Sequence, residues 1–286
     1  MTGFPSGTLL AQSALSGLFV GALYGLLGLG LSLSWGLLRQ INLAHFALAF
    51  LSAYLCYQLS AVGHLDPLLT LAIIVPLCFA VGVATQWLLA RFAITPFNSL
   101  LVTFGLTVIL ESLIQGIWTA DFRKLESVYG DTRFRIGALY VPAPELLTLI
   151  VAVALSLAVW ATLRFTDVGR ALRAAAEDGP IAEAFGIDRR RLGLLLAGVS
   201  AASAGIGGVC LALSHTLAPA QIYSWIGVVF AAVMMGGLGR ALGPLVAGIV
   251  IGVSESLTMA ITAPSWAPLV SFSLLLVVLL ARPDKF

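Results

Sequence analysis

The sequence has little charge. Asp, Glu, Lys and Arg make up 10% of its 286 residues, whereas apolar residues make up 60%. An average soluble domain is about 25% charged, because a globule in water needs a wettable exterior. A surface that faces lipid has no such need. The scarcity of charge therefore excludes an ordinary soluble protein and predicts an integral membrane protein.

Signals for common chemistry are also missing. The cysteines Cys56, Cys78 and Cys210 show no CxxC spacing, so neither a disulfide framework nor a metal site is expected. A P-loop needs Gly-Lys followed by Ser or Thr, and neither Lys124 nor Lys285 follows a glycine. No histidine cluster with metal spacing and no nucleophile elbow occurs. We expect no cofactor, no metal and no enzyme activity, so any ATP hydrolysis would need a separate chain.

Long runs without charge dominate what is present. Residues 1–38, 192–214 and 216–239, for example, contain no Asp, Glu, Lys, Arg or His. About 20 apolar residues carry a helix across a bilayer, and barrel strands would alternate apolar with polar residues. We predict an all-α, polytopic transmembrane helical bundle in a single domain, 1–286, with about nine spans and a range of eight to ten. The predicted spans are 10–37, 43–62, 68–90, 98–119, 146–164, 191–213, 222–238, 242–261 and 266–281.

The basic residues predict an orientation. They concentrate on the cytoplasmic side of membrane proteins, and an outside N-terminus with a cytoplasmic C-terminus puts eleven of the fifteen there. Those eleven are Arg39, Arg91, Arg164, Arg170, Arg173, Arg189, Arg190, Arg191, Arg240, Arg282 and Lys285. The other four fall in one outer loop, 120–145, which also carries acids such as Asp131. This loop either docks a partner outside or is a solvated connection. We expect a multi-pass protein of the bacterial-type cytoplasmic (inner) membrane.

The predicted cytoplasmic loop 166–190 is patterned. Asp167 is expected to cap a first helix, Pro180 to begin a second and Gly186 to end it, and Asp188 to cap the next span. Hydrophobic residues recur at roughly helical spacing: Val168, Leu172, Ala175, Ala182 and Phe185. The pattern predicts two short helices at the inner membrane surface.

An alanine-rich face and three acids, Glu177, Asp178 and Glu183, favour a protein partner for this loop. The alternative is a basic amphipathic hairpin resting on anionic lipid. Interspersed acids would weaken such lipid binding, so the protein partner is the preferred interpretation.

A family resemblance rests on four segments in the family's order, from about Ser16 to Leu257. Along the chain they are SGLFVGALYGLLGLGLSLSWGLLRQINLAH, LLVTFGLTVILESL, GRALRAAAEDGPIAEAFGI and VMMGGLGRALGPLVAGIVIGVSESL. They resemble, in that order, the first span, the fourth span, the cytoplasmic "EAA" loop and the late Gly-rich helices of permeases from branched-chain amino acid-type ABC importers. Phe46 and Ser52 stand where the family usually has glycine, which implies a bulkier wall at that turn.

The resemblance implies a permease subunit, not an enzyme. Its implied partners are two cytoplasmic ABC ATPase subunits, a second homologous permease, an extracytoplasmic solute-binding protein and membrane lipid, with no nucleic acid. Its implied solutes are branched-chain or other amino acids, urea or amides, or small aromatic acids. The residues implied in ATPase coupling are Gly169, Arg170, Ala175, Glu177, Asp178, Phe185 and Gly186.

Polar residues inside the predicted spans are candidate site residues, because an ionisable group at a helix centre costs about 2.5–3.5 kcal/mol. Glu111 lies deep in the fourth span, with Gln115 one turn later on the same face, and Glu255 lies in the eighth. Asn42 and His45 begin the second span and are expected to share a face. These groups could line a solute path, lock helices together or only pack; for His45 a hydrogen bond to a backbone carbonyl is the preferred interpretation.

Glycines predict close helix packing. Gly17, Gly21 and Gly25 form a ridge on the first span, and Gly248 with Gly252 repeats the spacing late in the chain. Such ridges let helices approach closely. Four further glycines lie around Arg240, and we expect a bent or broken helix beside the pathway there: Gly236, Gly237, Gly239 and Gly243.

Two other functions remain open. A gradient-driven secondary transporter would need paired intramembrane acids and two repeated halves; Glu111 and Glu255 could be such acids, but residues 14–36 and 195–213 share only small-residue composition. A structural membrane subunit without a pathway would not need a patterned helical loop between its spans.

Overall fold

Helices make up most of the computed structural model, which describes residues 6–92, 94–127, 129–130 and 132–281. Asp131, Arg282 and Lys285, which entered the charge argument, lie outside these ranges. The predicted polytopic helical bundle is confirmed. Its elements are α1 (Gly7–Leu38), α2 (Ala44–Tyr57) with a π-helical extension (Gln58–Val62), α3 (Leu71–Arg91), α4 (Pro96–Trp118), β1 (Arg133–Ile136), β2 (Leu139–Pro142), α5 (Ala143–Phe165), α6 (Asp167–Glu177), α7 (Gly179–Ala184), α8 (Arg189–Ser214), η2 (Pro219–Gln221), α9 (Ile222–Gly236), α10 (Gly243–Ile261), η3 (Pro264–Trp266) and α11 (Ala267–Ala281).

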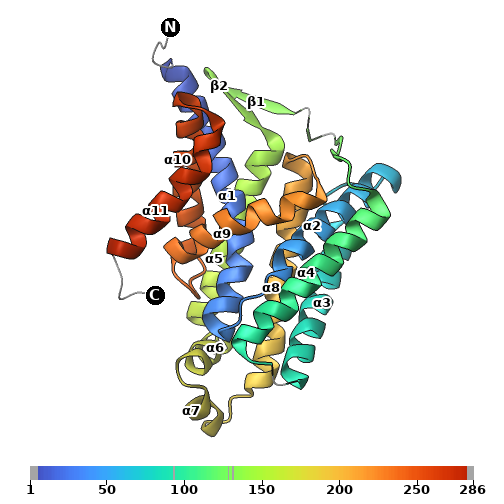
Figure 1. Ribbon diagram of the computed structural model, residues 1–286, viewed down its shortest axis with the longest axis vertical. Coiled ribbons are helices and arrows are strands. Elements are labelled where there is room, and N and C mark those ends of the chain that lie inside the picture. Colours follow the sequence, from blue (N-terminus) through green and yellow to red (C-terminus); the bar gives the residue numbers. More distant parts are fainter. Residues whose placement is uncertain (1–5, 93, 128, 131, 282–286) are drawn as a thin grey trace.

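The bundle has an inside and an outside. In the most apolar stretches of α1 and α8, 67% and 72% of the residues are buried, whereas the corresponding values for α3, α4 and α5 are 22%, 22% and 17%. Figure 1 shows α1 running through the middle, with α10 on one side, α2, α8 and α4 on the other, and α9 crossing in front of α1. The outer helices therefore present apolar surface to lipid or to partner subunits.

The glycine ridge of α1 packs directly on α10. A Cβ atom added to Gly21 would lie 2.4 Å from the carbonyl oxygen of Gly248, and one added to Gly17 would lie 2.5 Å from that of Gly252. Real Cβ atoms do not come so close to backbone, so only glycine permits this approach. The predicted ridge is confirmed, and the structure adds its partner: the two glycine repeats face each other in one seam.

Eight helices within the described residues are long and apolar enough to cross a membrane. This number lies inside the predicted range of eight to ten spans. The ninth predicted span, 266–281, corresponds to α11, which has 15 residues. At about 1.5 Å per residue it spans about 22 Å, less than the roughly 30 Å hydrocarbon core. Its residues match the predicted window except for Trp266, which lies in η3.

The predicted break near Arg240 is confirmed. α9 ends at Gly236 and α10 begins at Gly243. Between them Gly237 and Gly239 have φ angles of 88° and 72°, which disfavour side chains with a Cβ atom. The backbone N–H of Gly239 donates to the carbonyl of Ser32 at 3.0 Å, so the end of α1 supports the break.

The molecule has two unlike ends. The strands β1 and β2 form an antiparallel hairpin at one end, called here the hairpin end, and α6 with α7 lie at the other, called the loop end (Figure 1). The predicted outer loop 120–145 is thus partly folded, and α5 already begins at Ala143. Gln12 fixes the hairpin to α1, because its amide accepts from the Tyr140 N–H at 3.0 Å and donates to the Tyr140 carbonyl at 2.9 Å.

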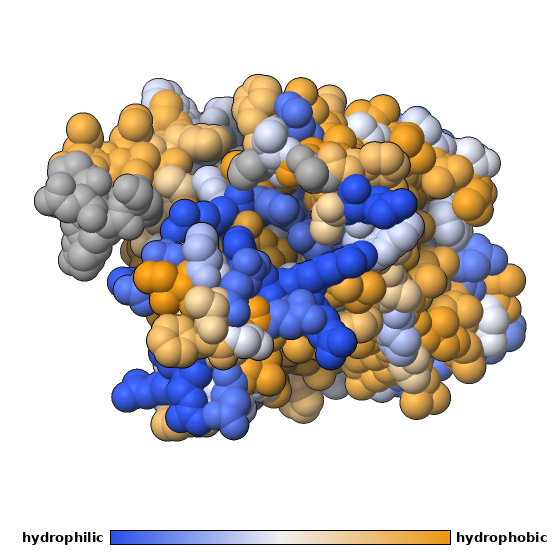
Figure 2. All heavy atoms as spheres, turned by 90° about the horizontal axis from the view of Figure 1, so that it is seen from below, coloured by the Kyte–Doolittle hydropathy of each residue, from blue (hydrophilic) through white to orange (hydrophobic). Residues whose placement is uncertain are grey.

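Seen from the loop end, hydrophilic residues gather over the middle of the molecule, and hydrophobic residues surround them (Figure 2). This is the distribution expected where a bundle leaves the bilayer.

At the hairpin end, the hydroxyl of Tyr129 donates to Asp66 at 2.9 Å, and this bond raises the pKa of Tyr129.

Candidate functional site

Glu111 sits in a polar cluster on the exposed flank of α4 and α9. Its Oε1 accepts from the Gln115 amide at 3.1 Å, and its Oε2 accepts from the Tyr223 hydroxyl at 2.5 Å. Glu111 is half-buried, and Gln115 and Tyr223 are exposed. Glu111 and Gln115 therefore lie on one face of α4 as predicted, and they also form a hydrogen bond, to which α9 adds a third polar group. A carboxylate on the open flank of a span is costly against lipid, so this arrangement favours a polar path or a partner subunit on this side.

Glu255 has the opposite environment. It lies in α10 with only 6% of its surface exposed. Its Oε2 accepts from the Tyr24 hydroxyl of α1 at 3.0 Å, and its Oε1 accepts from the Ser271 hydroxyl of α11. One carboxylate thus joins three helices, which is the geometry of a lock between helices.

His45 and Asn42 do not share a helix face. His45 is in the first turn of α2, fully buried, with Nε2 2.9 Å from the carbonyl oxygen of Leu27. This is the backbone contact expected for His45. Asn42 precedes the helix, in the connection from α1, and its buried Oδ1 has no hydrogen-bond partner within the described part of the chain. The expectation of a shared face was wrong because α2 begins only at Ala44.

Phe46 forms the bulky wall that the sequence implied. It is 1% exposed and stacks on Phe230 of α9, with ring centroids 6.2 Å apart. Ser52 is fully buried beside Gly208 of α8 and donates to the Leu48 carbonyl at 2.7 Å. The two positions thus fill the contact of α2 with α8 and α9.

The loop between α5 and α8 forms the two predicted helices, with one change at their start. The cap of α6 is Thr166, whose hydroxyl accepts from the Gly169 N–H at 3.2 Å. Asp167, the predicted cap, lies one residue later, in the first helical turn, where it pairs with Arg170. Both residue types cap helices well, so the sequence alone did not separate these neighbours.

The second helix and the following span begin as predicted. The Asp178 carboxylate accepts from the Ile181 N–H at 3.1 Å and caps α7, so this acid is partly used within the loop. Gly186 follows α7 with a φ of 85°, and the Asp188 carboxylate accepts from the Arg191 N–H at 3.0 Å at the start of α8.

The loop helices are tied to three spans. A Cβ atom on Gly169 would lie 2.4 Å from the carbonyl oxygens of Thr162 and Leu163, so α6 packs closely on the end of α5. The Arg39 guanidinium, at the end of α1, donates to the Ala176 carbonyl at 2.9 Å. Arg189, at the start of α8, lies 3.5 Å from Glu183. A force on the loop would therefore reach α1, α5 and α8 directly.

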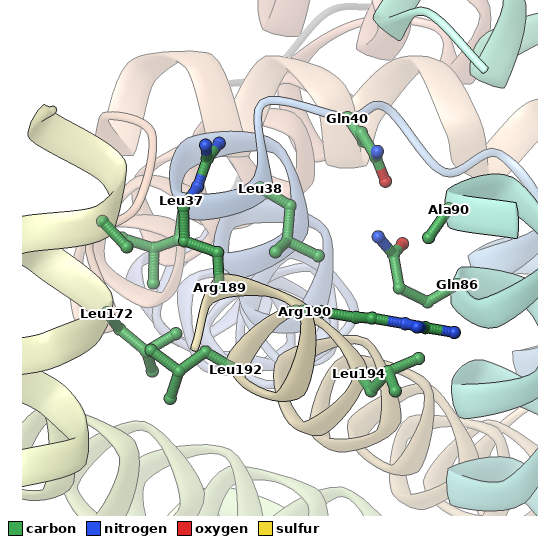
Figure 3. A pocket seen from close by; sticks show the side chains of 12 residues that line it. Leu37, Leu38, Gln40, Gln86, Ala90, Leu172, Arg189, Arg190, Leu192 and Leu194 are labelled. Atoms are coloured by element: carbon green, nitrogen blue, oxygen red, sulfur yellow. The ribbon is translucent and has the colours of Figure 1, made fainter. Parts of the chain in front are cut away.

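A cavity of about 230 Å³ lies between the loop and the spans, and Ala175 lines it. Figure 3 shows Gln40 and Gln86 on one side of this cavity and Leu172 and Leu192 on the other. Empty space at this junction leaves room for the loop helices to shift against the ends of α1, α3 and α8.

The outer face of the loop offers a mixed surface. Phe185 is 84% exposed and Ile181 is 56% exposed. They line a groove of about 650 Å³ together with Glu177 and Asp178. An apolar side chain this exposed, beside acids and outside the spans, is typical of a protein-docking surface.

Three polar partners were not found from the sequence. Tyr223, Tyr24 and Ser271 complete the two glutamate clusters, and each comes from a different helix than its glutamate. No spacing signal links such residues, because contact between distant helices depends on the whole packing arrangement.

Comparison with known proteins supplies the family. Residues 13–279 match the family described as "Branched-chain amino acid transport system / permease component". The high-affinity branched-chain amino acid transport system permease protein LivH of Salmonella typhimurium is 26% identical over 288 residues, 95% of this chain and 93% of that protein. The corresponding permease protein BraD of Pseudomonas aeruginosa is 24% identical over 294 residues, 95% of this chain and 94% of that protein. A probable LivH of Methanocaldococcus jannaschii is 28% identical over 249 residues, 81% of this chain and 76% of that protein.

No solved structure matches the chain. The family match nevertheless covers nearly the whole sequence, and it falls on a bundle whose described residues include eight helices able to span a membrane. The chain therefore belongs to the permease component family of branched-chain amino acid transport systems, and it is a multi-pass protein of the inner membrane.

Proposed function

We propose that this chain is the membrane-spanning subunit of an ATP-driven importer for a small polar solute. Branched-chain amino acids are the first candidates, since the named relatives are permease proteins for them. Other amino acids, urea, amides and small aromatic acids are further candidates. The hairpin end faces outward, toward a solute-binding protein, and the loop end faces the cytoplasm.

The observation that carries this proposal is the loop of α6 and α7. It exposes Phe185 outward while it packs on the ends of α1, α5 and α8. Two ATPase subunits each grip one such loop, on this chain and on a second permease, which is a homologue or a copy. Closure of the ATPases moves the loops, and the loops move the spans. Coupling of this kind requires two states of the permease that differ in their contacts at the loop end and at the hairpin end.

The proposed solute path runs beside α4. Support comes from the polar cluster of Glu111, Gln115 and Tyr223 on the open flank of this bundle. A zwitterionic solute carries an ammonium group, and the Glu111 carboxylate can accept hydrogen bonds from it. The second permease would face this flank and close the path.

The test is co-purification of tagged protein from mild detergent, with mass spectrometry of the partners. We expect P-loop ATPase chains and a second multi-span permease. Much less ATPase should co-purify with the Phe185→Ala variant than with the unaltered chain. The matched control is Phe97→Ala, because Phe97 lies in the first turn of α4 and is 71% exposed but is outside the loop.

Two results would contradict the proposal. If Phe185→Ala retains the ATPase as the unaltered chain does, the loop is not the docking surface. If the chain purifies alone and moves solute under an ion gradient without ATP, it is a secondary transporter.

A further inference from the structure

A second groove at the loop end is basic. It has a volume of about 690 Å³ and lies where α5 ends, α6 passes and α10 begins. Arg164, Arg173 and Arg240 line it, and none of the residues that line it is acidic. No ion pair joins any of these three arginines to another described residue. Three cations thus share one hollow without a protein counter-charge.

The floor of the groove is built from glycine backbone. Gly243 lies so close to Gly236 that an added Cβ atom would come within 2.0 Å of the Gly236 carbonyl oxygen. The absence of side chains at this contact keeps the hollow open. The N-terminus of α10 also opens into it, with Leu242 and Gly243 in its lining. A helix N-terminus carries a partial positive charge, which adds to that of the arginines.

The groove walls continue into the part of the molecule that faces lipid. Trp160, one of the lining residues, lies under the Arg164 guanidinium, 5.4 Å from it to the ring centroid. Tryptophan is typical of the membrane–water interface. On α10, Val246 lines the groove and is 62% exposed, and Val250, one turn further into the span, is 45% exposed. An anion held by the arginines would therefore have an apolar strip beside it that enters the bilayer.

We propose that this groove binds an anionic phospholipid of the leaflet at the loop end, with the phosphate among the three arginines and an acyl chain along Val246 and Val250. Basic pockets between transmembrane helices bind anionic lipid headgroups in this way. The groove for the ATPase differs, since it carries acids and an exposed phenylalanine. A bound lipid would bridge α5, α6 and α10, so it would join the loop to the α1–α10 seam. This site does not depend on which solute is carried.

The test uses the purified full chain in nonionic detergent, titrated with dioleoylphosphatidylglycerol and followed by native mass spectrometry. Each arginine near an anionic surface contributes roughly 1 kcal/mol, which is about fivefold in affinity. Arg240→Gln should therefore weaken phosphatidylglycerol binding about fivefold, and the combined Arg164→Gln, Arg173→Gln and Arg240→Gln variant about a hundredfold. Arg91→Gln is the matched control, because Arg91 also ends a span but does not line the groove.

Further arms separate the alternatives. The melting temperature without added lipid should differ little among the variants, since the three exposed arginines form no ion pair with another described residue and the contact of Arg164 with Trp160 is worth only about 0.5–1 kcal/mol at an exposed site. Dioleoylphosphatidylcholine should bind weakly, and excess inorganic phosphate should not displace phosphatidylglycerol. Equal binding by the triple variant, equal binding of phosphatidylcholine, or displacement by phosphate would each overturn the lipid assignment. The assignment would also be overturned if the triple variant bound lipid normally but no longer retained the ATPase, because the groove would then be part of the ATPase contact.

Discussion

Glu111 and Glu255 both lie well inside spans of this bundle, and they have opposite surroundings. Glu255 is enclosed by α1, α10 and α11, with both carboxylate oxygens bonded to hydroxyls of other helices. Glu111 is half-buried on the open flank of α4, and among the described residues only Tyr223 of α9 bonds to it from another helix. The comparison teaches that an intramembrane acid is not by itself a transport residue. Its neighbours decide whether it joins helices or remains available to a solute.

The same contrast extends to the helices that carry these acids. The α1–α10 seam brings backbone against backbone through facing glycines, whereas α4 has glycines with no atom near them. A Cβ atom added to Gly105 or Gly116 would meet nothing within 4 Å. The seam is therefore a rigid part of one subunit, and the α4 flank is surface left for something outside it.

We expect the largest effect from substitutions that compare a glycine of the α1–α10 seam with a glycine on the α4 flank. Gly21→Leu should prevent folding, because the side chain must enter the space of the Gly248 backbone. Ordinary overpacking costs about 1–3 kcal/mol, and rigid backbone cannot yield as a side chain can. The measurement is the yield of monodisperse protein in size-exclusion chromatography. Gly105→Leu is the control and should be recovered normally; equal loss of both variants would show that the two helices do not differ in this respect.

The next effect concerns the buried glutamate. Glu255→Leu leaves the hydroxyls of Tyr24 and Ser271 without an acceptor, and each such buried group costs about 1–3 kcal/mol. The melting temperature should fall clearly, by about 5 °C or more, in a thermal shift assay. Glu255→Gln keeps an acceptor oxygen and should lose less. An unchanged melting temperature for Glu255→Leu would remove its role as a lock.

Glu111, on the open flank of α4, should show the reverse pattern. Glu111→Leu should leave the melting temperature within about 2 °C of the unaltered chain, since surface changes usually cost under about 0.5 kcal/mol. Uptake by the assembled transporter should nevertheless fall about tenfold or more, because a hydrogen bond to a charged group is worth about 1.5–3 kcal/mol. Normal uptake would reduce Glu111 to a packing residue.

The smallest expected effect tests the contact across helices. Tyr223→Phe removes the hydroxyl that donates to Glu111 and keeps the ring. At an exposed site this bond is worth about 0.5–1 kcal/mol, so uptake should fall only about two- to fivefold. The double variant with Glu111→Leu should be no worse than Glu111→Leu alone. Additive losses would mean that Tyr223 acts separately from Glu111.

Local sequence signals predicted much of this structure. The apolar runs predicted the spans. Pro180, Gly186 and Asp188 predicted the second loop helix and the start of α8, because caps and helix ends depend on residues a few positions apart. The glycine spacing gave a packing ridge but not its partner. Which helix lies opposite depends on the whole chain, and the same holds for Tyr24, Tyr223 and Ser271.

Two errors had local causes. Thr166 and Asp167 are adjacent good caps, and only the backbone geometry at the end of α5 selects Thr166. Asn42 was expected to share a helix face with His45, but α2 begins only at Ala44, so Asn42 lies in the connection before the helix.

The most direct test of the central claim is solute uptake by the purified complex in proteoliposomes. The measurement compares radiolabelled leucine uptake, with the binding protein outside, when the vesicles contain ATP and when they contain only an imposed ion gradient. The account predicts uptake with ATP, loss of it in Glu111→Leu at unchanged assembly, and none from the gradient alone. Uptake driven by the gradient without ATP, or full ATP-driven uptake in Glu111→Leu, would contradict it.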